Sequence, residues 1–239
     1  MEILNKQGEV IDHTFHEGAQ EDVLVIYGHG LTGDKDRELI VALAEGLAQK
    51  GWRGLRISFS GNGDSGGKFE DSTPSKSVAD LQAVLDAVKG TRKIVYLGHS
   101  LGGAVAALTA ARDGRINALV SLAGMVRTKD FCEAEFGGVT PGEGCMWEDE
   151  TKPLSQKFVD DMNLIEHTFE AAISVEVPWL LFHGTADDVV LPKDTEHVFR
   201  KISSKKKQVM VEGEGHMFAD HYSFLVDEID QWLNSEGLE

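Results

Sequence analysis

Short apolar runs recur along the chain, and most are separated by stretches whose apolar residues follow a helical spacing. The runs occupy residues 23–27, 55–59, 94–97, 118–122, 179–182 and 208–211. Helical spacing marks residues 37–49 and residues 78–89, where the apolar positions are Leu39, Ile40, Leu43 and Leu47, then Leu81, Val84, Leu85 and Val88. This alternation predicts an α/β fold with a mostly parallel central sheet flanked by helices on both faces.

Both ends of the chain extend this pattern. Residues 2–4 and 10–15 flank a segment that contains Gly8, which predicts an antiparallel hairpin leading into the sheet. Near the carboxyl end, a helical stripe predicts a final helix that closes the core; it comprises Phe218, Tyr222, Leu225, Val226, Ile229 and Trp232.

One span, residues 125–175, interrupts the alternation. It contains a glycine-rich stretch at residues 137–144 and a helical run at residues 154–169. A long excursion between two strands is the usual place for a lid, so we expect a small cap insertion there. The alternative is a long surface loop with one extra crossover helix.

Length and composition indicate one globular unit. A chain of 239 residues with 41% hydrophobic and 26% charged residues can bury one sizeable core, so we expect a single domain over residues 1–239. The formal charge of −17 disfavours nucleic acid and anionic membranes as partners. No apolar stretch approaches the length of a membrane helix, and the first residues lack the regions of a signal peptide. A cytoplasmic protein is therefore expected. A homodimer is an alternative to a monomer that the sequence leaves open.

Two cysteines lie in the predicted insertion. Cys132 and Cys145 show no ligand spacing for zinc, and no metal site is expected. Free thiols are the first interpretation for a cytoplasmic chain, and a disulfide is the alternative.

The sequence Gly-His-Ser-Leu-Gly at residues 98–102 ends an apolar run and opens an alanine-rich helical pattern. This arrangement is typical of a nucleophile elbow, in which a tight strand-to-helix turn exposes the serine hydroxyl. Ser100 is thus the candidate nucleophile; the alternative is a serine that only caps the following helix.

A serine needs a base and an orienting acid to act as a nucleophile. Asp187 follows the strand at 179–182, and His216 follows the strand at 208–211. The chain order Ser100, Asp187, His216 is that expected for three loops at the carboxyl edge of one parallel sheet. The neighbouring Asp188 and the later His221 are the rival acid and base.

A second glycine-rich segment, residues 28–33, follows the first core strand. Acyl transfer needs two N–H donors for the developing oxyanion, and the backbone N–H groups of Leu31 and Leu101 are the natural pair. His29 is expected to brace this loop rather than to catalyse.

The sequence Gly-Asp-Ser-Gly-Gly at residues 63–67 resembles the active-serine segment of trypsin-like proteases. Those enzymes place histidine and aspartate before the serine on an all-β fold. Since this chain alternates strands and helices, we interpret Ser65 as a turn residue.

Taken together, these motifs resemble the α/β-hydrolase superfamily over essentially the full length. Residues 29–33 and 58–71 are similar to compact bacterial cinnamoyl and feruloyl esterases and related carboxylesterases, which carry a similar small cap. That subgroup commonly has an acidic residue in place of Ser58, a histidine in place of Asn62 and a glutamine in place of Leu101. The resemblance implies ester hydrolysis through a covalent Ser100 ester, with no metal or cofactor. Aspartate would be expected at position 100 in a dehalogenase.

Three functions remain open from the sequence. The first is a carboxylesterase for short or medium acyl or hydroxycinnamoyl esters, with a small-molecule ester as partner. The second is a monoacylglycerol lipase or thioesterase, and the third is a non-catalytic binding protein on the same fold. Cap residues are the candidates for the substrate pocket, although each could belong to the cap core instead; they are Phe131, Phe136, Met146 and Trp147.

Overall fold

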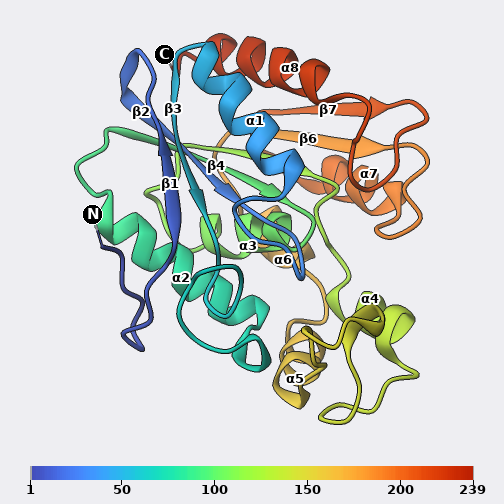
Figure 1. Ribbon diagram of the computed structural model, residues 1–239. Coiled ribbons are helices and arrows are strands. Elements are labelled where there is room, and N and C mark those ends of the chain that lie inside the picture. The colour runs from blue at the N-terminus through green and yellow to red at the C-terminus, as the bar shows by residue number, and fades with distance from the viewer. Residues whose placement is uncertain (1, 239) are drawn as a thin grey trace.

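Seven strands form one sheet in the computed structural model, which describes residues 2–238 (Figure 1). The order across the sheet is β1-β3-β2-β4-β5-β6-β7, and only β1 runs antiparallel to its neighbour. The strands are β1 His13–His16, β2 Gln20–Gly28, β3 Trp52–Ile57, β4 Lys93–His99, β5 Ala118–Leu122, β6 Trp179–Gly184 and β7 Lys206–Val211. The predicted mostly parallel sheet is confirmed.

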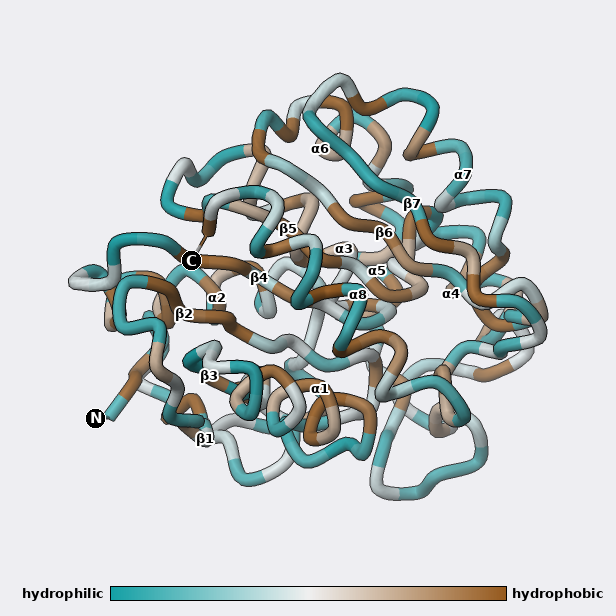
Figure 2. The backbone as a smooth tube through the Cα atoms, turned by 90° about the horizontal axis from the view of Figure 1, so that it is seen from above, coloured by the Kyte–Doolittle hydropathy of each residue, from teal (hydrophilic) through white to brown (hydrophobic). Residues whose placement is uncertain are grey.

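Helices cover both faces of the sheet, as the alternation predicts. Helices α1 Glu38–Gln49 and α8 Tyr222–Ser235 pack on one face, and α2 Pro74–Ala87, α3 Leu101–Ala110, α6 Phe169–Ile173 and α7 Pro192–Lys201 pack on the other. The central strands β4 and β5 are buried on both sides, which explains their continuous apolar runs. Figure 2 shows hydrophobic segments concentrated in the central strands and hydrophilic ones in the outer loops.

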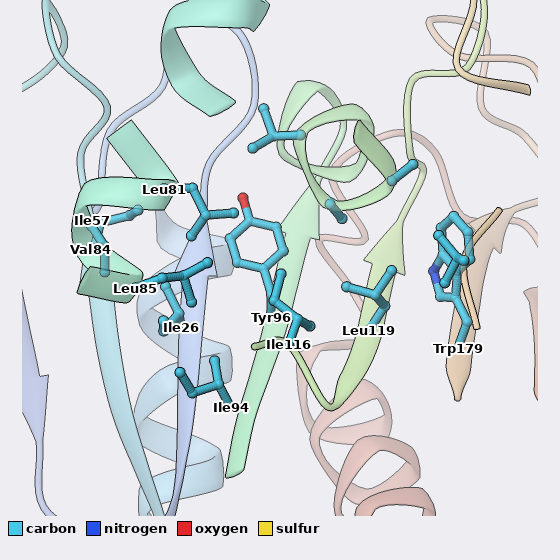
Figure 3. Close-up of a cluster of buried hydrophobic side chains, with 14 of the residues drawn as sticks. Ile26, Ile57, Leu81, Val84, Leu85, Ile94, Tyr96, Ile116, Leu119 and Trp179 are labelled. Atoms are coloured by element: carbon cyan, nitrogen blue, oxygen red, sulfur yellow. The ribbon is translucent and has the colours of Figure 1, made fainter. Parts of the chain in front are cut away.

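The core on the α2 side is centred on Tyr96 of β4 (Figure 3). Its ring lies among Ile26 of β2 and Leu81 and Leu85 of α2, all at most 4% exposed. Burying one such aliphatic side chain stabilises the fold by about 1.5–3 kcal/mol. The layers are therefore held together mainly by these apolar contacts.

The amino-terminal hairpin is present but shorter than predicted. Residues 2–12 contribute one isolated antiparallel bridge, Leu4 with Val10, and the strand that joins the sheet is β1, which pairs with β3. Residues 10–12 also bind the segment after β3: Gly66 N–H donates to Val10 O at 2.8 Å, and Asp12 N–H donates to Ser65 Oγ at 2.8 Å. The hairpin bonds are kept beside these long-range contacts, since Ile11 N–H donates to Ile3 O at 2.8 Å.

Two predicted helices have different boundaries. The run at residues 154–169 is divided, because α5 Gln156–Ile165 ends before Glu166, which adopts a left-handed φ of 60°. The final helix begins at Tyr222 rather than at Phe218, whose φ is 53° and whose side chain is fully buried in the turn before the helix. Phe218 thus belongs to the apolar stripe without being helical.

Between β5 and β6, the chain leaves the sheet and returns. Helix α4 Thr128–Phe136, the 3₁₀ turn η2 Met146–Glu148 and helix α5 surround an apolar cluster of their own, and Figure 1 shows α4 and α5 standing apart from the sheet. That cluster also includes Leu101 and Ala104 at the start of α3. Helix α6 packs back on the sheet. The projecting part, α4 to α5, therefore lies against the element that begins directly after Ser100.

Candidate active site

Ser100 occupies the turn between β4 and α3. Its φ of 53° and ψ of −114° are unusual for a residue with a side chain, and such a conformation costs of order 1–3 kcal/mol. Backbone hydrogen bonds hold it: Ser100 N–H donates to Leu122 O, and Ser100 O accepts from Gly103 N–H and Met125 N–H, each at 2.9 Å. The strained turn is thus maintained by its neighbours on β5 and α3.

The glycines beside Ser100 permit a close approach of three backbone segments. A Cβ on Gly98 would overlap the carbonyl oxygen of Gly102, and a Cβ on Gly102 would overlap that of Gly28 at the end of β2. Helix α3 therefore begins in direct contact with the end of two strands. This packing accounts for the Gly-x-Ser-x-Gly spacing.

Asp187 lies in the loop after β6, and its side chain is fully buried. Its Oδ1 accepts backbone N–H bonds from Val189 at 2.9 Å and Val190 at 3.0 Å. Its Oδ2 lies 2.8 Å from Nδ1 of His216. Since an ionised carboxylate only accepts hydrogen bonds, Nδ1 of His216 carries the proton and Nε2 is left as an acceptor.

The geometry brings Asp187 and His216 together from loops that lie 29 residues apart in the sequence. His216 follows β7 and lines one cavity with Ser100. The ring of the adjacent His99 donates from Nε2 to the carbonyl oxygen of His216 at 3.0 Å. His99 therefore connects the loop that carries His216 to the turn that carries Ser100.

Sequence reasoning did not identify His183, which also contacts Asp187. Its Nε2 lies 2.7 Å from Val190 O and 3.1 Å from Asp187 Oδ2, and its Nδ1 lies 2.7 Å from Thr195 Oγ1. Because Val190 O and the carboxylate are acceptors, Nε2 carries the proton and the Thr195 hydroxyl donates to Nδ1. The signal in the sequence is a histidine inside an otherwise apolar strand, four residues before Asp187.

The surroundings of Asp187 favour its charged form. Burial acts to raise its pKa, but the hydrogen bonds from His183 and His216, the charge of His216 and the Val190 N–H outweigh burial. The pKa of Asp187 is therefore held well below its usual range. An anionic carboxylate at this point can stabilise a positive charge on His216.

The glycine-rich loop after β2 passes directly beside the nucleophile. A Cβ on Gly30 would lie 3.1 Å from Cβ of Ser100. Within residues 2–238, the backbone N–H groups of Leu31 and Leu101 have no protein acceptor. Both are free to receive an oxyanion, and Leu31 lines the cavity of Ser100.

His29 holds this loop in place. Its Nδ1 lies 2.8 Å from Gly30 O, and its Nε2 accepts the N–H of Phe59 at 3.0 Å. Both ring nitrogens are thus used by backbone groups, and burial lowers the pKa of His29 to about 4. His29 bridges the loop after β2 to the segment after β3.

A cavity of about 260 Å³ opens beside Ser100. Two predicted pocket residues, Phe131 and Trp147, line it. The lining residues are Gly30, Leu31, Thr32, Gly33, Arg37, His99, Ser100, Phe131, Trp147, Val189, His216 and Met217. Catalytic candidates and apolar walls therefore share one space.

A second cavity of about 420 Å³ adjoins the first, because Phe131 and Val189 line both. It lies between α4 and the loop that leads into α7. The other two predicted pocket residues, Phe136 and Met146, line neither cavity and are buried in the cap cluster, 3% and 1% exposed. In this structure Phe136 and Met146 pack between α4, η2 and α5.

The rival residues lie in other environments. Asp188 is exposed, and His221 pairs with Glu214, its Nδ1 lying 2.5 Å from Oε1. Ser65 is buried; its hydroxyl donates to Ser58 O at 2.7 Å and accepts from Asp12 N–H. Ser65 is a structural residue in the segment after β3.

Three further observations concern the cysteines, possible metal sites and possible membrane helices within residues 2–238. Cys132 and Cys145 are free thiols. Among residues 2–238, no cluster of three or more histidine, cysteine or acidic side chains is arranged to hold a metal ion. None of the helices in that range is long and apolar enough to cross a membrane.

Known proteins share this fold. A family model described as alpha/beta hydrolase fold matches residues 23–165. The chain is similar to Est1E from Butyrivibrio proteoclasticus with ferulic acid bound, at a TM-score of 0.90 and 25% identity over 100% of both chains.

Two further solved structures are similar at lower identity. A monoacylglycerol lipase from Paleococcus ferrophilus superposes at a TM-score of 0.77 and 22% identity, covering 94% of this chain and 98% of the lipase. Alpha/beta hydrolase domain-containing protein 10 from mouse superposes at 0.80 and 19%, covering 98% of each. These two show the fold alone. No curated protein matches the chain by sequence.

Proposed function

The chain belongs to the alpha/beta hydrolase fold family, and from this premise we propose that it is a serine hydrolase that cleaves carboxylic esters. One observation carries the proposal: the fully buried carboxylate of Asp187 is hydrogen-bonded to His216, which lines one cavity with Ser100 on the strained turn. A nucleophile, a base and an orienting acid in this order form a complete acyl-transfer site.

In the first half of the proposed reaction, Ser100 Oγ attacks the ester carbonyl carbon and His216 Nε2 takes its proton. The carbonyl oxygen becomes an oxyanion that accepts hydrogen bonds from the N–H groups of Leu31 and Leu101. Each such donor lowers the barrier by about 3 kcal/mol. His216 then gives the proton to the leaving alcohol as the carbon–oxygen bond breaks, and a Ser100 ester remains.

In the second half, a water molecule gives a proton to His216 and attacks the Ser100 ester. The oxyanion forms again at the same donors, and its collapse releases the carboxylic acid and returns the proton to Ser100. Asp187 holds the Nδ1–H tautomer of His216 throughout and offsets the transient imidazolium charge.

For the substrate we propose short or medium acyl esters or hydroxycinnamoyl esters. Aromatic walls at Phe131 and Trp147 suit a planar group, and the similarity to Est1E with bound ferulic acid supports an aromatic acid. Leu101, at the start of α3 directly after Ser100, makes the surroundings of the nucleophile more apolar than a glutamine at this position would.

The second candidate is a monoacylglycerol lipase or thioesterase. The adjoining cavity of about 420 Å³ favours it, because a longer acyl chain could extend past Phe131 and Val189. A non-catalytic binding protein is the least favoured alternative, since such a protein would not need the pairing of Asp187 with His216.

Two measurements test these proposals. Turnover of p-nitrophenyl esters from acetate to palmitate, together with ethyl ferulate and an acyl-CoA, separates the candidates; strong preference for long chains or the thioester favours the second. Labelling with a fluorophosphonate tests the nucleophile, with Ser100→Ala expected to abolish it and Ser65→Ala to retain it. Tight ligand binding without turnover or labelling would favour the binding protein.

A further inference from the structure

Arg37 lies on the wall of the Ser100 cavity and is its one permanently charged lining residue within the described part of the chain. It immediately precedes α1 and is exposed, which places it at the solvent side of the cavity. The other side-chain walls are mainly apolar, with Phe131, Trp147 and Met217 among them. The fixed positive charge of Arg37 therefore stands out against the mainly apolar walls of the cavity.

The side chain of Arg37 is directed along the loop beside the nucleophile. A Cβ on Gly33 would lie 3.2 Å from Arg37 Cγ and 3.4 Å from Nε, so the absence of a side chain at Gly33 leaves room for the arginine stem. One terminal nitrogen of Arg37 donates to Thr32 O at 3.3 Å. The guanidinium is therefore held next to Leu31, whose N–H is a candidate oxyanion donor.

Within residues 2–238, Arg37 has no ion pair, although acidic residues outnumber basic ones by 40 to 23. Several other arginines form ion pairs, among them Arg115 with Asp113 and Arg127 with Asp194. A guanidinium has five N–H donors in a planar fork that fits a carboxylate. The Arg37 guanidinium makes only one hydrogen bond within residues 2–238, so the fork has capacity for a ligand.

We infer that Arg37 makes the Ser100 cavity selective for esters that carry a carboxylate on one half, next to an apolar or aromatic other half. This inference rests on the proposed ester hydrolysis and names the substrate class of the same site. The carboxylate binds Arg37 at the cavity mouth, and the apolar half lies against Phe131 and Trp147.

The net charge of the protein opposes this selectivity at long range. A charge of −17 repels anions, so any preference for an anionic ester must come from a local contact. A control variant must therefore remove one positive charge elsewhere. Arg112 provides it, because it is exposed, follows the carboxyl end of α3 and does not line the cavity.

The experiment uses two pairs of esters that differ in one carboxylate. The acyl-half pair is p-nitrophenyl hemiglutarate and p-nitrophenyl methyl glutarate; the alcohol-half pair is 4-acetoxybenzoate and methyl 4-acetoxybenzoate. For each pair, the kcat/KM ratio of anionic to neutral ester is measured for the unchanged protein, Arg37→Gln, Arg37→Lys and Arg112→Gln. Dividing the ratios between proteins cancels the intrinsic reactivity of the esters.

Arg37→Gln is expected to lower the ratio about five- to thirtyfold in one of the pairs, as for a partly exposed charge-assisted contact. The affected pair identifies the half that carries the carboxylate. Arg37→Lys should recover part of the ratio, because it keeps the charge without the fork, and Arg112→Gln should leave it unchanged. Equal ratios in Arg37→Gln and Arg112→Gln for both pairs would overturn the inference.

Failure of the proposed function has a different signature. In that case the unchanged protein hydrolyses neither member of a pair, and calorimetric binding of the intact esters to Ser100→Ala replaces turnover. Weaker binding of an anionic ester in Ser100→Ala with Arg37→Gln than in Ser100→Ala with Arg112→Gln would still support the Arg37 site. Equal binding in the two double variants would reject it.

Discussion

His183 Nε2 lies 3.1 Å from Asp187 Oδ2, the same oxygen that accepts the hydrogen bond from His216. Both side chains of this contact are fully buried. The candidate acid therefore has two histidine partners, one facing the cavity of Ser100 and one facing the protein interior. His183 is a positioning residue, because it acts on the cavity only through Asp187.

Replacing His183 by phenylalanine should lower kcat about ten- to a hundredfold with a smaller change in KM. The substitution removes a hydrogen bond to a charged group, worth about 1.5–3 kcal/mol, and lets the carboxylate turn away from His216. His183→Gln, which retains an N–H donor, should recover part of kcat. Urea unfolding of each variant separates this effect from loss of folded protein. A kcat equal to that of the unchanged enzyme would mean that His183 only fills space.

The two adjacent aspartates should differ strongly. Asp187→Asn cannot hold the Nδ1–H tautomer of His216, and a comparable change in a serine protease lowers kcat about 10⁴-fold. Asp188→Asn changes an exposed side chain and should alter kcat by less than about threefold. Steady-state kinetics on one p-nitrophenyl ester compares the pair. A larger loss in Asp188→Asn would assign the acid to residue 188.

Ser65→Ala and Ser100→Ala should have opposite effects on stability and reactivity. Loss of the Ser65 hydroxyl leaves the part-buried Asp12 N–H without its acceptor, which costs about 1–3 kcal/mol of unfolding free energy. Fluorophosphonate labelling of that variant should continue. Ser100→Ala should lose labelling and keep its stability, or gain some. Labelling that disappears in Ser65→Ala while the protein stays folded contradicts this assignment.

Stability should fall as the pH decreases from 7 to 5. Burial lowers the pKa of His29 to about 4 and, together with the charge of His216, that of His99 to about 3. In the unfolded chain both histidines take up protons below about pH 6.5, so the unfolded state binds more protons and gains stability as the pH falls. The loss at pH 5 is about 2 kcal/mol for each histidine, and it continues until the folded pKa is reached.

Urea unfolding at pH 8 and pH 5 checks this dependence. A His29→Asn variant should be less stable than the unchanged protein at pH 8, because two backbone partners are lost, yet its stability should change less between the two pH values. Identical changes in the two proteins would show that His29 is not buried as a neutral ring.

Two aromatic residues between β5 and β6, Trp147 and Phe136, should have different roles, one in binding the substrate and one in packing. Trp147 is 46% exposed and lines the Ser100 cavity, so Trp147→Ala should raise KM for aromatic esters several-fold with a smaller loss of stability than Phe136→Ala. Phe136 is buried among Phe131, Trp147 and Phe158, and Phe136→Ala should cost about 3–5 kcal/mol. Kinetics and thermal unfolding measure both. The reverse pattern would place the ester on the Phe136 side.

The succession of strands along the chain and the residues at their ends could be predicted from the sequence. Runs such as 118–122 are continuous and apolar because β5 is buried on both faces, and its observed bounds agree with the prediction. Parallel strands all end at one edge, so Asp187 could be expected near His216 from chain order alone. Hydrophobic periodicity and the rules of parallel sheets carry this information locally.

Contacts between distant segments could not be read in the same way. The antiparallel pairing of Leu4 with Val10 could be predicted, but the additional bonds of residues 10–12 to Gly66 and Ser65 could not. Phe136 and Met146 are of the residue types that line apolar pockets. Only the packing of the folded chain shows that they lie in the apolar cluster of α4, η2 and α5.

By itself, the sequence determined the layered α/β fold and named Ser100, Asp187 and His216 as candidates, since periodicity and chain order are properties of the chain. Tertiary structure alone decided that His183 shares the carboxylate of Asp187, and that Arg37 lines the Ser100 cavity without an ion pair among residues 2–238. Both relationships depend on which side chains meet after the layers pack. A hydrogen bond between distant side chains follows no periodic pattern along the chain, and neither does the lack of an ion pair. No local stretch of sequence can therefore predict either of them.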